Sequence, residues 1–315
     1  MSKYDGPTFS TALLHPKYWG VWFGFGLLAL LVNVLPFRAQ LLLGRGLGRM
    51  AMPFAKKRVK VAHRNLELAF PTMPQDEIQR TVIENFKNTG FALFETGITW
   101  FWPAWRLKRH LKVHNAEPIK GFAAQKRGVL VCHPHALNLE VSARAFAVLG
   151  YPGHGVYRPH SNPAYDFIQY WGRTHNGNKV IDRKNLKEMI RTLKSGERLF
   201  YLGDHDYGPN KSVFVPFFAI QDACTVTGAN ILVKMTDCAI IPMTGFRDTD
   251  GKWELYFDDP IHENFPKDDL EAGATYMNKA LEVAILRKLD QWMWLHKRYK
   301  TMKDKSLAKG CRYQN

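Results

Sequence analysis

The sequence predicts an α/β protein with a mostly parallel or mixed central sheet flanked by helices, and with an N-terminal membrane-anchoring helix. Two observations predict this class. From residue 129 onwards, short apolar β-branched runs alternate with helix-forming segments. Residues 18–35 contain no charged side chain. The chain therefore divides into an anchor, residues 1–40, and a main domain, residues 41–315, that carries the chemistry.

The composition limits the kinds of partner. The chain has 315 residues and a formal net charge of +16, so its partners are expected to be anionic: nucleic acid, phospholipid headgroups, a phosphorylated substrate or an acidic carrier protein. Charge alone does not choose among these. The four cysteines contain no Cys-x-x-Cys pair, which disfavours a zinc ribbon and is typical of reduced thiols.

The apolar run 18–35 is close to the minimum length that spans a bilayer. Tyr18, Trp19 and Trp22 crowd its front edge, as aromatic residues do at membrane interfaces. A buried core helix is the alternative, and a signal peptide fits poorly because no small-residue cleavage pattern follows. Cationic residues behind the run outnumber those before it, which places the main domain on the cytoplasmic side if the run spans. They are Arg38, Arg45, Arg49, Lys56, Lys57, Arg58 and Lys60, against Lys3 and Lys17.

The remaining elements follow in order. Residues 40–70 are expected to be helical and basic on one face, and a second helix is expected from Asp76 to about residue 100. An apolar strand follows Gly128, and a helix is expected over residues 136–149. Further helices are predicted at 163–173, 185–193, 224–236 and 270–286. One strand is predicted to end near residue 158, and further strands are predicted at 198–202, 239–246 and 253–257.

His135 falls at the junction of a predicted strand and a predicted helix, which is where open α/β sheets usually keep their chemistry. Glu140 follows it by five positions. If His135 sits in the turn and Glu140 one turn into the helix, the carboxylate can reach back to the imidazole. A base held by a carboxylate is the arrangement that takes a proton from a hydroxyl. A structural histidine is the alternative reading.

Two further blocks carry candidate ligands. Arg158 stands at a strand end before Pro159, where its guanidinium can bind a phosphate or form a surface ion pair. Asp204, His205 and Asp206 follow another apolar strand. With His133 and His135 they could form a metal site, although no recognised ligand spacing such as His-Glu-x-x-His supports it. The chain has no Gly-x-Ser-x-Gly elbow, and its glycine-rich patches do not follow a strand.

These blocks, taken together, resemble the late acyltransferases of lipid A biosynthesis, within the wider glycerolipid-acyltransferase-like superfamily. The resemblance runs from Phe9-Ser-Thr-Ala-Leu-Leu-His-Pro-Lys-Tyr-Trp19 through His135-x4-Glu140, Gly155-Val-Tyr-Arg-Pro159 and Asp204-His-Asp-Tyr-Gly208 to Met293-Trp-Leu-His-Lys-Arg-Tyr-Lys-Thr301. It is stronger to the lauroyl or palmitoleoyl branch than to the myristoyl branch.

The resemblance implies an enzyme of the bacterial inner membrane with its catalytic domain on the cytoplasmic face. It would transfer an acyl chain from acyl carrier protein to a hydroxyl of the 3-hydroxyacyl chain of Kdo2-lipid IVA. His135 would be the general base and Glu140 its orienting partner, with His133 as the alternative base. Arg158, Asp204 and Asp206 would bind substrate. No metal, redox cofactor or nucleic acid is implied, since acyl-acyl carrier protein is a co-substrate that carries the driving force.

Two other functions compete with this reading. One is a glycerophospholipid acyltransferase of the wider superfamily. The other is a non-catalytic membrane protein that binds anionic lipid or nucleic acid through its basic face.

Overall fold

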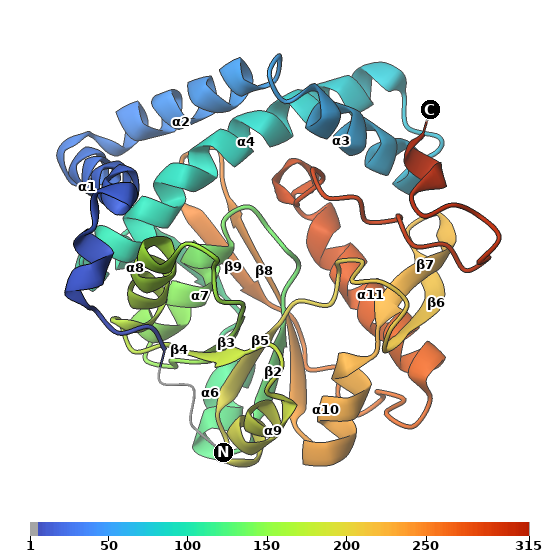
Figure 1. The fold of residues 1–315 in the computed structure, drawn as a ribbon. Coiled ribbons are helices and arrows are strands. Elements are labelled where there is room, and N and C mark those ends of the chain that lie inside the picture. Colours follow the sequence, from blue (N-terminus) through green and yellow to red (C-terminus); the bar gives the residue numbers. More distant parts are fainter. Residues whose placement is uncertain (1–5, 315) are drawn as a thin grey trace.

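A seven-stranded sheet runs through the centre of the computed structural model, which describes residues 6–314 (Figure 1). The strand order is β1-β9-β8-β2-β5-β3-β4. Neighbouring strands are parallel except for β8 and β9, which pair antiparallel. The expected α/β class with a mixed sheet is therefore confirmed.

The sheet strands are β1 (Leu111–His114), β2 (Val129–Cys132), β3 (His154–Tyr157), β4 (Lys179–Asp182), β5 (Arg198–Tyr201), β8 (Ala239–Arg247) and β9 (Trp253–Phe257). A separate hairpin is formed by β6 (Ser212–Phe217) and β7 (Ile220–Val226). The helices are α1 (Trp19–Val34), α2 (Phe37–Ala51), α3 (Lys56–Ala69), α4 (Gln75–Phe101), α5 (Ala104–Lys108), α6 (Glu117–Ala124), α7 (Leu139–Val148), α8 (Pro163–Thr174), α9 (Leu186–Lys194), α10 (Gly228–Thr236) and α11 (Leu270–Leu286).

Helices cover both faces of the sheet because its central strands are apolar on both sides. In β2, Val129 and Val131 face a cluster that contains α6 and α7, whereas Leu130 and Cys132 face a cluster that contains α9, α10 and α11. Alternate side chains of a strand point to opposite faces, so a continuous apolar run needs cover on both. The arrangement leaves the carboxyl ends of the strands as the edge available for chemistry.

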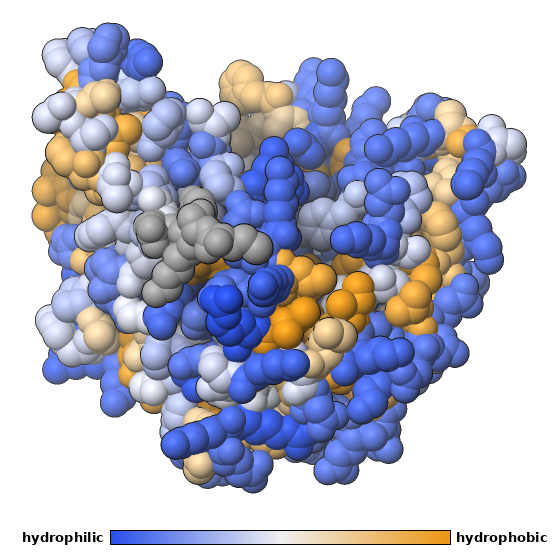
Figure 2. All heavy atoms as spheres, turned by 60° about the horizontal axis from the view of Figure 1, so that its bottom comes forward, coloured by the Kyte–Doolittle hydropathy of each residue, from blue (hydrophilic) through white to orange (hydrophobic). Residues whose placement is uncertain are grey.

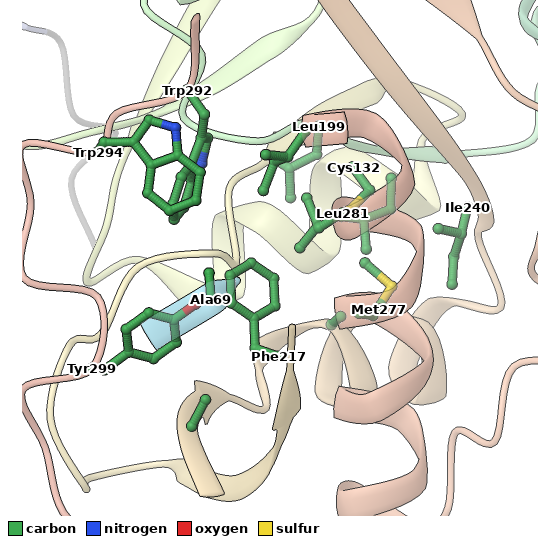
Figure 3. Close-up of a cluster of buried hydrophobic side chains, with 14 of the residues drawn as sticks. Ala69, Cys132, Leu199, Phe217, Ile240, Met277, Leu281, Trp292, Trp294 and Tyr299 are labelled. Atoms are coloured by element: carbon green, nitrogen blue, oxygen red, sulfur yellow. The ribbon is translucent and has the colours of Figure 1, made fainter. Parts of the chain in front are cut away.

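The larger core packs against one face of the sheet (Figure 3). Leu199 of β5 and Leu281 of α11 pack there with Trp292 and Trp294 from the C-terminal segment. Both indoles are almost fully buried. A tryptophan buries more apolar surface than other side chains, so this cluster fixes the position of the chain around residue 292.

The N-terminal helix α1 packs along the main domain. Leu28 and Val32 are buried against α4, where a Cβ at Gly97 would lie only 2.7 Å from Leu28. The carbonyl of Val32 accepts hydrogen bonds from the side chains of Gln40 and Trp102. Helix α2 and the end of α4 therefore bind the C-terminal end of α1 and hold it along one edge.

Three local predictions differ from the structure. Residues 40–70 form two helices, α2 and α3, because Pro53 lacks an amide hydrogen and disfavours helix at the residue before it. The predicted helix 224–236 begins only at Gly228, since Cys224 to Val226 pair with β6 as part of β7. Strands β1 and β4 were missed, because their mixed polar sequences become strands only through pairing with β9 and β3.

Candidate active site

The candidate site lies where three parallel strands end side by side. β2, β5 and β3 are consecutive in the sheet, so the segments that follow them meet at one edge. His135 lies three residues after β2, Asp204 three residues after β5, and Arg158 directly after β3. Pro134 ends β2, since it has no amide hydrogen to offer the sheet.

The carboxylate of Asp204 contacts both the ring and the backbone of His135. Its Oδ1 lies 2.6 Å from His135 Nδ1, and its Oδ2 accepts the backbone N–H of His135 at 2.8 Å. Asp204 is fully buried, whereas 15% of the His135 side chain is exposed. A carboxylate only accepts hydrogen bonds, so Nδ1 carries the hydrogen and Nε2 has a free lone pair. His135 can therefore act as a general base through Nε2.

The C-terminal segment fixes this carboxylate from a third side. Trp292 Nε1 donates to Asp204 Oδ2 at 2.6 Å. The same segment runs antiparallel to the loop that carries His135, with Leu137 N donating to Gln291 O and Met293 N to His135 O. Burial alone would raise the pKa of Asp204, but the charge and hydrogen bonds of His135 lower it well below its usual range. The carboxylate therefore remains ionised.

A stack of three imidazole rings extends from the base toward the surface. The ring centroids of His135 and His205 are 3.5 Å apart, and those of His205 and His296 are 4.5 Å apart. Burial, followed by the charge of His135, lowers the pKa of His205 to about 3. His205 is therefore neutral at physiological pH and can lie against His135 without charge repulsion.

The geometry fits a metal ion poorly. Ligand atoms of His135, Asp204 and His205 lie within 4.8 Å of one another. However, the two imidazole planes are only 6° apart, and nitrogen lone pairs lie in the ring plane. Stacked rings do not direct both lone pairs to one point, as tetrahedral zinc requires. This cluster is better suited to hold an imidazole than a cation.

Glu140 does not hold His135 as expected. Its carboxylate accepts from Arg173 Nε at 2.9 Å and from Arg173 Nη2, and from Trp100 Nε1 at 3.2 Å. Helix α7 begins at Leu139, so the Glu140 side chain lies against α4 and α8. The expectation of a His135–Glu140 pair is corrected: Asp204 is the carboxylate that holds the base, and Glu140 forms an ion pair in the neighbouring wall.

The other predicted residues have different surroundings. Asp206 is buried, and its two oxygens accept from Gly208 N and from the backbone and hydroxyl of Thr301, so it joins the loop to the C-terminal segment. Like Asp204, it is buried and hydrogen-bonded within the protein, and substrate binding by either residue stays a prediction. His133 is fully buried, and burial lowers its pKa to about 4. Arg158 is exposed at the same edge of the sheet as His135.

The sequence interpretation missed two parts of the site. The role of Asp204 as partner of His135 was detectable in principle, since two predicted buried strands each end in a polar block and parallel strands end at the same edge. Trp292 lies in a segment without regular secondary structure, 88 residues from Asp204. No local pattern marks such a contact.

A pocket that opens to solvent lies between α7, α8 and the strands β3 to β5, and it encloses about 690 Å³ when the open solvent at its mouth is included. Leu139, Val156, Phe200 and Leu202 supply apolar surface, and Glu140 and Arg173 line it as well. Leu202 is two residues before Asp204, and Leu139 is four residues after His135. The pocket therefore includes residues from the segments that carry His135 and Asp204, although neither of these two side chains lines it.

A carboxylate-held imidazole at the carboxyl edge of an α/β sheet is an arrangement suited to general-base catalysis in an α/β enzyme. The family model for bacterial lipid A biosynthesis acyltransferases matches residues 6–301, and the chain belongs to this family.

Individual relatives cover nearly the whole chain. The lipid A biosynthesis lauroyltransferase of Escherichia coli (strain K12) is 47% identical over 295 residues, covering 94% of this chain and 96% of the relative. The palmitoleoyltransferase of the same organism is 39% identical over 93% of this chain and 95% of its own length. The myristoyltransferase of the same organism is 28% identical over 94% of this chain and 92% of its own length. The greater similarity to the lauroyl and palmitoleoyl enzymes, expected from the sequence blocks, is confirmed.

Proposed function

We propose that this chain transfers a fatty acyl group, lauroyl or palmitoleoyl, from acyl-acyl carrier protein to a hydroxyl on the 3-hydroxyacyl chain of Kdo2-lipid IVA. The observation that carries the proposal is His135, whose Nδ1 lies 2.6 Å from the buried carboxylate of Asp204. The membership of the lipid A acyltransferase family supports the acceptor class. The greater identity to the lauroyl and palmitoleoyl enzymes supports the acyl class.

The chemistry follows from the free Nε2 of His135. As the acceptor oxygen attacks the thioester carbonyl, Nε2 takes the hydroxyl proton, and Asp204 stabilises the imidazolium that forms. The tetrahedral intermediate then expels the thiolate, and His135 returns the proton to its sulfur. General-base catalysis of this kind contributes about a hundred- to ten-thousandfold. Backbone N–H groups in the first turn of α7 are suited to stabilise the oxyanion.

The donor chain would occupy the pocket between α7, α8 and the strands β3 to β5. Its apolar lining from Leu139, Val156, Phe200 and Leu202 suits a hydrocarbon chain, and burial of each methylene group contributes about 0.8 kcal/mol. Competition between acyl carrier proteins loaded with chains of different length measures the preference. A preference for chains of 12 to 16 carbons supports this assignment, and equal use of all lengths contradicts it.

The two N-terminal helices would attach the enzyme to the cytoplasmic face of the inner membrane. Exposed apolar side chains form a stripe on α1, with Trp19, Phe23 and Leu30, and another on α2, with Leu43 and Leu47. Figure 2 shows apolar residues along the left edge, on the side where α1 lies in Figure 1, and further apolar residues near the middle of this face. Pro16–Val34 is long and apolar enough to cross a membrane.

The packing of α1 favours contact along the membrane surface over a crossing. Its buried edge is held by α4 and by the side chains of Gln40 and Trp102, so a crossing would draw polar parts of the main domain into lipid. Apolar α1 and amphipathic α2 lying together in the interface avoid that cost. Cationic residues such as Arg38 and Lys56, which follow the two stripes, suit anionic headgroups.

His135→Ala tests the proposed function. Wild-type protein in mixed micelles is expected to acylate Kdo2-lipid IVA with lauroyl- or palmitoleoyl-acyl carrier protein. The variant should lose at least a hundredfold in kcat while circular dichroism shows the same fold. A glycerophospholipid acceptor in parallel separates the related acyltransferase reaction. Binding of anionic lipid with no acyl transfer by wild-type protein would favour the non-catalytic alternative.

A further inference from the structure

One face of α3 lines a strongly basic pocket. Five of its residues and two from the C-terminal segment surround about 820 Å³ of solvent-open space. Five of the lining side chains are cationic, namely Lys57, Arg58, Lys60, Arg64 and Lys297. Positions 57, 60, 61 and 64 are three or four residues apart, so helical periodicity brings them to one face.

The positive charge of this pocket is largely uncompensated. Among the described residues, no carboxylate lines it. Arg58 donates to the carbonyl of Leu295, and Arg64 Nε donates to that of Arg312, both neutral groups. Arg64 also reaches Glu67, but that pair is partly exposed and weakly neutralising. The other basic segment, near Lys112, differs, because its ammonium group contacts Asp248, Asp250 and Glu254.

Hydrogen bonds and ring stacking connect the pocket to the active site. Asn65 of α3 donates to the carbonyls of Trp294 and His296, each at 2.6 Å. His296, which directly precedes Lys297 in the chain, stacks on His205, and His205 stacks on His135. The pocket is therefore linked to His135 through His296 and His205, by two ring-stacking contacts in the C-terminal segment and the loop after β5.

We propose that this pocket binds the anionic groups of the acceptor's sugar headgroup, its phosphates or carboxylates, and so positions the acceptor hydroxyl at His135. The proposal rests on the proposed function, since it names the binding site of that same substrate. An acceptor with several anionic groups on one compact headgroup matches several cations around one concave space. Binding of the headgroup in this pocket would hold the acceptor hydroxyl at the base, which lowers the entropic cost of bringing the two together.

An acidic carrier protein fits this pocket less well than a headgroup does. A specific protein interface buries about 800 Å² on each partner and is usually broad, whereas these cations converge on one hollow between a helix and two chain segments. The start of α3 adds to the preference for a small anion. Its N-cap residue, Ala55, provides no side-chain hydrogen bond, so helix N–H groups and the helix dipole remain available there.

The test replaces two pocket lysines whose ammonium groups point to no carboxylate in the described part of the chain. Lys57→Gln with Lys60→Gln removes two charges and keeps the length of both side chains. The matched control is Lys187→Gln with Lys194→Gln on α9, which removes two exposed charges that do not line the pocket. Steady-state kinetics in neutral-detergent micelles then give kcat and KM for each substrate.

The pocket variant is expected to raise KM for Kdo2-lipid IVA roughly five- to twentyfold, with kcat and KM for the acyl donor little changed. Enzymatic removal of the acceptor's phosphates should shrink the difference between the variant and wild type. The α9 control should behave as wild type. An unchanged acceptor KM, or an increase confined to the donor KM, overturns the proposal, the latter in favour of carrier-protein docking. Failure of wild-type protein to acylate the acceptor would instead reject the proposed function.

Discussion

Asp204→Asn gives the most direct test of how the base is held. The carboxylate accepts three hydrogen bonds, from His135 N at 2.8 Å, from His135 Nδ1 at 2.6 Å and from Trp292 Nε1 at 2.6 Å. The Asn side chain has only one oxygen that can accept hydrogen bonds. Its amide nitrogen is a donor and cannot accept from any of these three N–H groups. If the amide nitrogen faces the ring, the hydrogen must move to Nε2, which then cannot take the acceptor's proton.

The expected loss in kcat is about a hundred- to ten-thousandfold, which corresponds to about 2.7 to 5.4 kcal/mol in the activation free energy. KM for both substrates should change little, because Asp204 is fully buried and its hydrogen bonds are to His135 and Trp292. The assay is the initial rate of acyl transfer in mixed micelles, corrected for the folded fraction measured by circular dichroism.

Asp206→Asn is the matched control. It removes a buried carboxylate two residues away, which bonds Gly208 and Thr301 rather than the imidazole. This variant is expected to lower the melting temperature, with less than a tenfold loss in kcat for the folded protein. If Asp204→Asn keeps kcat within threefold of wild type, the argument that this carboxylate orients His135 is refuted.

The remaining predictions concern the surroundings of the base. Trp292→Phe removes one N–H donor from the carboxylate and should lower kcat roughly threefold to thirtyfold at unchanged KM, as measured by steady-state kinetics; an unchanged kcat would show that the indole acts only in packing. Glu140→Gln and Arg173→Gln break the same ion pair, so a double-mutant cycle on the free energy of unfolding should give a coupling of about 1–2 kcal/mol, whereas additive losses would contradict the pairing. Burial lowers the folded-state pKa of His133 to about 4 and of His205 to about 3, so the unfolded chain binds more protons below about pH 6.5. Stability should therefore fall as the pH decreases from about 6.5 to 4, by up to about 1.4 kcal/mol per pH unit for each of the two groups. Urea unfolding at several pH values measures this slope, and His205→Gln should reduce it; the same slope in that variant would reject the assignment.

The sequence by itself determined the fold class and the neighbourhood of the site. Apolar runs such as Val129–Cys132 fix a doubly covered sheet, since they must be buried on both faces. His135 follows such a strand, and the carboxyl edge of the sheet is where that chain order places it. Local sequence also identified Asp204 as a polar residue after a buried strand. These features depend on neighbours within a few residues, which a linear pattern records.

Only the tertiary structure decided which carboxylate meets the base. Glu140 is five residues from His135 but turns toward Arg173 and Trp100, whereas Asp204 is 69 residues away and lies beneath the imidazole. The order of β2, β5 and β3 in the sheet produces this contact, and strand order follows from packing of the whole chain. Trp292 reaches the same carboxylate from a segment held by the buried core, for which no local period exists. Sequence spacing predicts contacts along one element, whereas contacts between elements depend on how the sheet is assembled.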